Sequence, residues 1–213
     1  MPARILNDHN TILIDDSNPS LALRQKQTIA TNARVASFSY SGAETPTIAL
    51  RSSSPCYLRN IDISGSNRVF HAMITQDAFQ ADVTGYIYDR PVDSGAAWGF
   101  KLRDAQGRIT FDALGKYGRV ATVMNGAGSW TGTAGRDYAT TILSFRFRDE
   151  ILVSSTPGYR HRRVSRTMAW VNGSTVHVGL QILSDIHYPS SEAPIVFWDY
   201  GTPSVLVTDV TGY

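Results

Sequence analysis

Apolar residues recur at every second position along this chain, and this spacing restricts the fold more than any other feature of the sequence. In residues 98–112, WGFKLRDAQGRITFD, Phe100 and Leu102 alternate with charged residues, and Ile109 and Phe111 alternate with polar ones after the segment DAQG. A period of two is that of a β-strand with one buried face, whereas a helix needs a period near 3.6. The segment therefore predicts a β-hairpin.

Two residues, Asp104 and Gly107, favour a turn in the middle of this hairpin. The carboxylate of Asp104 is placed to accept hydrogen bonds from the backbone that follows it, and Gly107 adopts a positive φ without steric cost. Similar turn segments, among them SGSN, NGAGS and YPSSEAP, divide the chain into candidate strands about 8–12 residues apart. Almost no stretch has helical spacing. The pattern predicts an all-β protein of the sandwich type, jelly-roll-like in its strand spacing.

The opening segment ARILNDHNTILID, residues 3–15, is a shorter copy of residues 98–112. Three further pairs follow in the same order: TIALR (47–51) with TILSF (141–145), FHAMI (70–74) with VHVGL (176–180), and YIYDRP (86–91) with VFWDYGTP (196–203). The offset between the copies grows along the chain, which indicates an insertion around residues 148–166. The sequence therefore predicts two tandem homologous β-sandwich domains, residues 1–92 and 93–213, joined by the linker PVDSGAA.

The composition fits a folded protein and argues against several functional classes. Hydrophobic residues make up 42% and charged residues 18%, and the net charge of +2 is too small for a dedicated nucleic-acid binder. Cys56 is the single cysteine, so no intramolecular disulfide forms. The N-terminal residues lack the apolar region of a secretory leader, and the apolar run APIVFW is far shorter than the roughly 20 residues of a membrane span. We expect no nucleic-acid partner and no membrane span.

Sequence signatures of catalysis are missing. The chain has no phosphate-binding glycine loop, no HExxH, no GxSxG and no Cys/His set with metal-ligand spacing. His71 and His177 occupy matching positions of the two copies, where a shared structural role is the simpler interpretation. Neighbouring acids such as Asp15 and Asp16 point to opposite faces of a strand and do not form a catalytic pair. We expect no catalytic residue, no cofactor and no metal.

The segment GYRHRRVSR, residues 158–166, is a dense basic stretch that lies in the predicted insertion. Its basic side chains are Arg160, His161, Arg162, Arg163 and Arg166. Guanidinium groups bind carboxylates and phosphates through two parallel hydrogen bonds. The segment is therefore a candidate site for an acidic partner subunit or an anionic surface ligand, and the alternative is a solvated loop that keeps an edge strand soluble.

Aromatic residues near the predicted domain boundary form a second candidate surface. Tyr86, Tyr88 and Trp98 lie within a short stretch, and alternation places Tyr86 and Tyr88 on the same face of one strand. Exposed rings stack on sugars or anchor protein contacts, so these residues are candidates for ligand or partner binding. Packing in the core is the alternative.

The first hairpin carries a candidate subunit interface. Ile12 and Ile14 point to one face of the predicted strand, and Leu13 occupies the other face, where the second copy has the polar Thr110. Apolar residues on both faces indicate a strand that is covered on both sides. A neighbouring subunit would supply that cover, so we expect a homo-oligomer or a symmetric ring or trimer.

The hairpin of residues 98–112 resembles the one that opens small tail-associated proteins of long-tailed, siphovirus-type bacteriophages. The positions that match the pattern are Phe100, Leu102, Asp104, Gly107, Ile109, Phe111, Asp112 and Ala113. The upstream YIYDRP also resembles the aromatic-Asp segment that precedes the hairpin in that family. The first copy keeps Leu6, Ile12, Ile14 and Asp15 but lacks the turn glycine. The closer match covers about 30 residues and extends loosely along both halves.

The resemblance implies a non-enzymatic structural protein of the phage tail tip or tail fibre. Such a protein assembles in the host cytoplasm, becomes part of the virion tail, and contacts other tail-tip proteins. A host-surface receptor, such as a glycan or a pilus, is a further candidate partner. Two alternatives stay open: a carbohydrate-binding or adhesin-like module outside any virion, and a glycan depolymerase, which would need two carboxylates about 5–10 Å apart in a groove.

Overall fold

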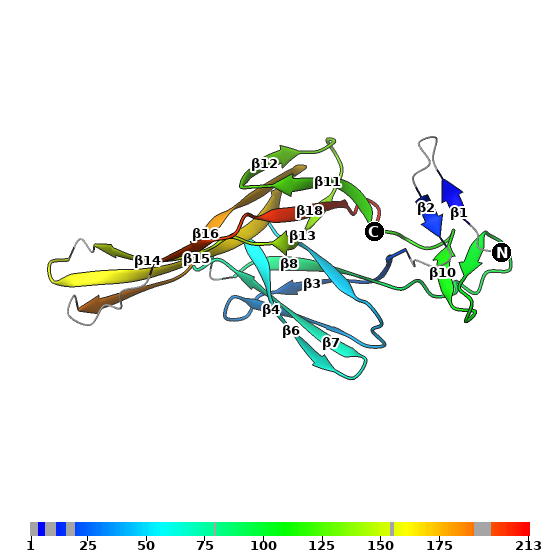
Figure 1. The fold of residues 1–213 in the computed structure, drawn as a ribbon, viewed down its shortest axis with the longest axis horizontal. Helices are drawn as coiled ribbons and strands as arrows, with labels where there is room; N and C mark the ends of the chain where they lie inside the picture. The colour runs from blue at the N-terminus through cyan, green and yellow to red at the C-terminus, as the bar shows by residue number, and fades with distance from the viewer. Residues whose placement is uncertain (1–3, 7–11, 16–19, 79, 154–155, 190–196) are drawn as a thin grey trace.

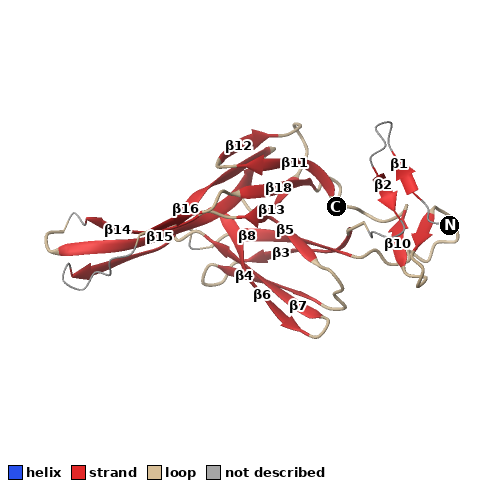
Figure 2. Ribbon diagram, in the orientation of Figure 1, coloured by secondary structure: helices blue, strands red, loops and turns tan. Residues whose placement is uncertain are grey.

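The computed structural model describes residues 4–6, 12–15, 20–78, 80–153, 156–189 and 197–213. Every regular element in these residues is a β-strand, which confirms the prediction of an all-β protein. Figures 1 and 2 show an elongated molecule, with two layered sheets in the middle and smaller strand pairs at one end. Among the described residues there is no helix of the length and apolarity that crossing a membrane would require.

Two sheets form the central body. One has six strands in the order β11-β18-β13-β5-β8-β3, and the other has the path β12-β16-β15-β6-β7-β4 with β14 and β17 attached. The strands from the first half are β3 (Ala22–Ala30), β4 (Val35–Tyr40), β5 (Thr47–Arg51), β6 (Cys56–Ser64), β7 (Asn67–Ile74) and β8 (Asp82–Asp89). Those from the second half are β11 (Arg119–Asn125), β12 (Gly128–Thr131), β13 (Tyr138–Ser144), β14 (Phe147–Val153), β15 (Tyr159–Asn172), β16 (Thr175–Pro189), β17 (Trp198–Tyr200) and β18 (Ser204–Asp209).

The two halves contribute strands in the same order. The first half supplies β5-β8-β3 to one sheet and β6-β7-β4 to the other, and the second half supplies β13-β18-β11 and β15-β16-β12 in the corresponding places. The halves meet where β5 pairs with β13 through Leu50 and Thr140, and where β6 pairs with β15 through Cys56 and Ala169. Both sheets therefore run without interruption through the two halves.

One sequence match lies outside this repeated order. The segment YIYDRP falls in and after β8, but its proposed partner VFWDYGTP spans β17, which has no counterpart in the first half. The strand in the place of β8 is β18, whose end residue Asp209 is buried like Asp89 at the end of β8. The predicted match was wrong because it relied on the aromatic-Asp composition that the two segments share. The buried aspartate at the strand end, Asp89 in β8 and Asp209 in β18, is the feature that aligns the two halves.

The main core lies between the two sheets. In the first half, Phe38 and Phe70 pack against Ile48, Val83 and Ile87 from the opposite sheet. In the second half the inward-facing side chains form two adjoining clusters that include Trp130, Tyr138, Ala169, Val171, Val176, Val178, Val205 and Val207. Period-two alternation on each strand sends these side chains inward, so the pattern that predicted the strands also builds the core.

Tyr86 and Tyr88 lie on the opposite face of the six-stranded sheet from Ile87, as alternation requires, and both side chains are almost wholly buried. Their rings are buried with Ala49 and Ala139 under the C-terminal residues Val210 and Tyr213. The burial favours the alternative of packing in the core over a binding role for the two tyrosines. A chain segment far away in sequence covers this face of the sheet.

Asp89 and Asp209 are buried at the ends of equivalent strands and tie them to the loops before β5 and β13. The Asp89 carboxylate accepts hydrogen bonds from the backbone N–H groups of Glu44 and Thr45 at 2.9 and 2.8 Å. Burial by itself would raise the pKa of Asp89, but the backbone donors outweigh it, so the pKa is lowered.

Asp209 is held by a different set of donors. Its Oδ1 accepts the backbone N–H of Thr211 at 2.9 Å, and its Oδ2 lies 2.5 Å from the guanidinium of Arg136. Burial again acts to raise the pKa of Asp209, and the contacts with Thr211 and Arg136 lower it overall. Both aspartates are thus stabilised in their ionised form.

We expect the free energy of unfolding to fall in acid because of Asp89 and Asp209. Each folded-state pKa lies below the unfolded value of about 3.9, so the unfolded chain binds more protons in this range. The contribution is complete above about pH 5 and is lost as the pH falls through the folded pKa values. Urea unfolding between pH 6 and pH 2 should therefore show a flatter acid decline for Asp89→Asn and Asp209→Asn. The exposed Asp82→Asn in β8 is the control, and an equal change in that variant would contradict the assignment.

Two small hairpins lie at one end of the body (Figure 1). β1 (Arg4–Leu6) pairs with β2 (Ile12–Asp15), and β9 (Lys101–Arg103) pairs with β10 (Ile109–Asp112). The second has the turn that the sequence predicted, because Gly107 has φ +78° and Asp104 accepts the backbone N–H of Arg108 at 2.9 Å. The side chains of Ile12, Leu13 and Ile14 lie outside the described residues, and their interface role stays a prediction.

Candidate functional site

The strands β14 to β17 extend beyond the sandwich as a single layer, opposite to the two hairpins (Figure 1). We call this part, residues 147–152, 159–164, 183–189 and 198–200, the arm. Within these residues Asp149 is the one fully buried side chain, and none of the apolar side chains is buried. An arm without a second layer depends on backbone ladders and polar contacts rather than on an apolar core.

The register of the arm decides which side chains share a face. β15 pairs with β16 from Asn172 opposite Thr175 outward, and a bulge between Val164 and Ser165 shifts the remaining pairs by one residue. On the other side β15 pairs with β14, which in turn pairs with β17. No described strand pairs with the outer edge of residues 184–189.

Arg162 and Arg163 bind carboxylates of the arm itself. The guanidinium of Arg162 lies 2.5–3.1 Å from the two oxygens of Asp149, and that of Arg163 lies 2.9 Å from Asp185 Oδ2. Neither arginine therefore needs an external anion to balance its charge, which changes the role expected from the sequence. Residues 159–166 of the basic segment form part of the strand β15, which pairs with β14 on one side and β16 on the other, and not a loop.

Arg166 is also occupied within the chain. Its guanidinium carbon lies 3.8 Å from the ring centre of Phe145 and 4.7 Å from that of Tyr57. Burial lowers the pKa of Arg166, because the charge is partly removed from water at the base of the arm. The cation–π contacts fix the arm to the sandwich rather than offering a charge to a partner. Arg160, by contrast, is exposed.

Reversing the charge of Arg162 and Arg163 together should open the arm and leave the sandwich folded. Each new glutamate would face an aspartate that now has a cationic partner, and we expect a cost of about 2 kcal/mol after allowing for solvent screening. Hydrogen exchange of the arm amides should accelerate, while amides of the sandwich strands keep their protection. Arg160→Glu on the same strand is the control. An unchanged exchange rate in the double variant would show that these ion pairs do not hold the arm.

Exposed apolar side chains gather on the arm and next to it. They are Tyr159, Ile186, Phe197, Trp198 and Tyr200. Phe197 is 68% exposed and Trp198 is 60% exposed, although both follow a stretch rich in apolar residues. Trp98 is 73% exposed beside the second hairpin, so it is the one candidate aromatic that stays available to a partner. Contiguous exposed apolar surface marks interaction sites, and Trp and Tyr are enriched among the residues that dominate interface energies.

A groove of about 570 Å³ lies on the outer face of the six-stranded sheet. Its walls include Leu21, Phe111, Tyr117, Val120 and Leu143. Tyr88 also contributes to the wall, and its hydroxyl is buried with no hydrogen-bond partner among the described residues. Residues 16–19, which precede Leu21 closely, lie outside the description.

The matched histidines have matched structural contacts. His71 Nδ1 lies 2.8 Å from Ser37 Oγ, and His177 Nδ1 lies 2.7 Å from Ser129 Oγ, in corresponding strand pairs of the two halves. The shared structural role expected from the sequence fits these contacts.

Cys56 is buried where the halves meet, and burial raises the pKa of its thiol to about 12, so it is unreactive at neutral pH.

One group of side chains on the arm was not predicted from the sequence to lie together. His161, Asp185 and His187 lie together across β15 and β16, with the ligand atom of each within 4.8 Å of the others. Their separation in the sequence hides this arrangement, although the i, i+2 spacing of Asp185 and His187 on one strand face is a detectable clue. Comparison of the chain with family models, with curated proteins and with solved structures found no match.

Proposed function

We propose that this protein is a non-enzymatic assembly and attachment component that associates with its partners through the arm. The observation that carries the proposal is the group of exposed rings Phe197, Trp198 and Tyr200 at β17, a strand that pairs with β14 and has no described partner along its other edge, on a single-layer projection from the sandwich. Exposed rings supply the central contacts of protein interfaces, and an open edge offers backbone pairing to a second chain. Self-association through the arm, giving a homo-oligomer, is the form that we expect first.

The setting that we propose is the distal tail of a long-tailed bacteriophage. The support is the hairpin of residues 98–112, whose turn geometry around Gly107 suits the resemblance to tail-associated proteins. A tail tip or fibre requires a rigid scaffold that repeats around an axis, and a continuous sandwich with a projecting arm suits that requirement. Contact with other tail proteins and with a host-surface receptor belongs to the same proposal.

We further propose that the sandwich arose by tandem duplication of one β-sandwich unit, with the domain boundary near residues 92 and 93. Each half supplies one hairpin followed by six sandwich strands in the same sheet order. β14 and β17 fall outside this order, and β15 and β16 are longer than β6 and β7. The arm is therefore an addition to the second unit, and a new role in binding is easiest to acquire in such an addition.

Sedimentation velocity over a range of protein concentrations tests the interface. The wild-type chain should self-associate, and the variant Phe197→Ser/Trp198→Ser should require at least tenfold higher concentrations, since a few buried rings dominate interface energies. Val92→Ser, which removes an exposed apolar side chain outside the arm, is the control. A wild-type chain that stays monomeric at every concentration and binds no partner would refute the arm as an interface.

The setting needs a separate test. Antibodies against the folded chain should label the distal ends of tails in phage lysates of the strain that carries the gene, as seen by electron microscopy. Label on the bacterial surface without virions would favour the adhesin-like alternative. Glycan-array binding that depends on Trp98, which is exposed far from the arm, would favour carbohydrate recognition instead.

A further inference from the structure

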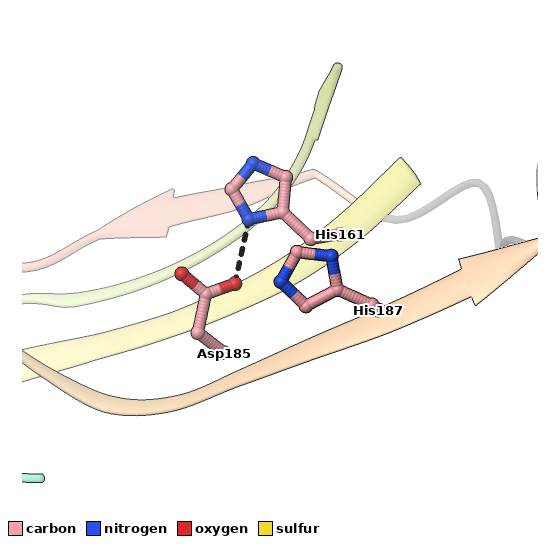
Figure 3. A group of neighbouring side chains, drawn as sticks. All are labelled: His161, Asp185 and His187. Atoms are coloured by element: carbon pink, nitrogen blue, oxygen red, sulfur yellow. Dashed lines mark hydrogen bonds and ion pairs between the residues drawn. The ribbon is translucent and has the colours of Figure 1, made fainter. Parts of the chain in front are cut away.

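Three potential metal ligands converge on one face of the arm (Figure 3). His161 lies directly opposite His187 in the pairing of β15 with β16, and their rings stack with centres 5.2 Å apart. Asp185 lies two residues before His187 on the same strand, and its Oδ1 is 2.7 Å from His161 Nδ1. His161 and Asp185 are partly buried, whereas His187 is exposed.

We propose that His161, Asp185 and His187 form a binding site for a divalent transition-metal ion, Zn²⁺, that ties β15 to β16 in the arm. Two imidazoles and one carboxylate are a donor set that Zn²⁺ prefers, with metal–ligand distances of about 2.0–2.2 Å. Ligands at that distance in tetrahedral geometry lie about 3.4 Å apart. The present separations, from 2.7 Å to at most 4.8 Å, need side-chain shifts of only about 1 Å to reach it.

The surroundings of the three residues suit a bound cation. Arg163 holds Asp185 Oδ2 at 2.9 Å, which fixes the carboxylate and leaves Oδ1 directed toward His161. A second partner of this kind orients a ligating carboxylate in many metal sites. Metal binding at His161 Nδ1 and Asp185 Oδ1 replaces the hydrogen bond between these two atoms, and the neutral imidazole then carries its proton on Nε2. The guanidinium adds one positive charge nearby, so we expect moderate rather than very tight affinity.

The site has a structural consequence for the arm. Among the described residues of the arm, no apolar side chain is buried. A metal ion bound by residues of both β15 and β16 would therefore cross-link the two strands where a core is missing. The three protein ligands leave at least one coordination position for water or for a donor from another molecule. The inference goes beyond the proposed assembly role, because the site would bind metal whether or not the arm contacts a partner.

Isothermal titration of the untagged, chelator-treated chain with Zn²⁺ tests the site. The wild-type chain should bind one ion, and His187→Ala or His161→Ala should weaken binding by more than about tenfold. His71→Ala is the matched control, because His71 forms a similar pair with Asp62 at 2.9 Å but has no third potential ligand beside it among the residues that the structure describes. Zn²⁺ should also slow hydrogen exchange of the amides in residues 159–164 and 183–189 of the wild-type chain.

Two results would overturn the inference. One is the absence of saturable binding at one ion per chain. The other is a loss of affinity in His71→Ala as large as that in His187→Ala, which would place the ion elsewhere. If His187→Ala proves unstable, His187→Gln keeps a polar side chain at the same position and should lose both the binding and the slowing of exchange.

Discussion

Replacing Phe38 by alanine is expected to lower the free energy of unfolding by about 3–5 kcal/mol. Phe38 is fully buried in β4, where it contacts residues of both sheets in the core of the first half. Removing its ring forfeits the transfer free energy of the side chain and leaves a cavity that the surrounding strands fill only in part. In a chain of 213 residues, this loss should lower the melting temperature by about 10 °C.

Urea unfolding monitored by circular dichroism, with thermal melting as a second measurement, checks this prediction. Phe197→Ala is the matched control, because the same atoms are removed from a ring that is 68% exposed. Its cost should stay within about 0.5 kcal/mol. If Phe38→Ala were no more destabilising than Phe197→Ala, the assignment of Phe38 to a tightly packed core would be wrong.

Adding one methyl group at Gly85 is the second change with a large expected effect. Gly85 lies in the middle of β8, and a Cβ atom there would come within 2.9 Å of the Phe38 ring and 3.1 Å of Ile48 Cδ1. The ring is fully buried, so it can give way only by displacing its neighbours in the core. We therefore expect Gly85→Ala to cost about 1–3 kcal/mol, although the same substitution usually stabilises a strand through the unfolded chain.

Two further variants make this prediction specific. Gly179 lies within β16, and a Cβ atom there would have its nearest neighbours at an ordinary 3.6 Å, so Gly179→Ala should be neutral or slightly stabilising. In the double variant Phe38→Ala/Gly85→Ala, the new methyl group occupies space that the ring has vacated. Its total cost should fall below the sum of the single costs by at least 1 kcal/mol, the coupling expected of side chains in contact. Strict additivity would contradict the proposed contact.

These predictions separate the two parts of the molecule. The sandwich owes its stability to enclosed side chains such as Phe38, and changes there should affect the whole chain. The arm is held by ion pairs such as Arg162 with Asp149 and by strand pairing, and changes there should affect local opening. A protein built in this way can alter its binding surface without loss of its scaffold.

Much of the local structure was predictable from the sequence. Alternation around Phe100 and Ile109 indicated the second hairpin, and Gly107 was identified as its left-handed turn residue. The segment NG at residues 172–173, a dipeptide typical of tight hairpin turns, lies at the turn between β15 and β16. These features depend on a few neighbouring residues, and φ preference and period-two alternation act at that range.

Interactions between distant segments were not predictable in the same way. Tyr86 and Tyr88 were assigned to one face correctly, but their burial depends on Val210 and Tyr213, more than 120 residues later. Arg162 and Arg163 were recognised as a charged cluster, but their partners Asp149 and Asp185 come from two different strands. Sequence patterns show that a side chain needs a partner, and tertiary pairing decides which partner it receives.

In the arm, the local sequence pattern predicts the strands but not the register in which β15 and β16 pair. The chain by itself determines the strands, their turn at Gly173 and the apolar periodicity, because each follows from local chemistry. Uninterrupted pairing from that turn would put His161 opposite Ile186, with Asp185 and His187 on the other face. The bulge near Leu183 shifts the register by one residue, so that His161 faces His187. Alternation and turn chemistry do not specify where a bulge falls, so this shift, and with it the group of three proposed metal ligands, is visible only in the tertiary structure.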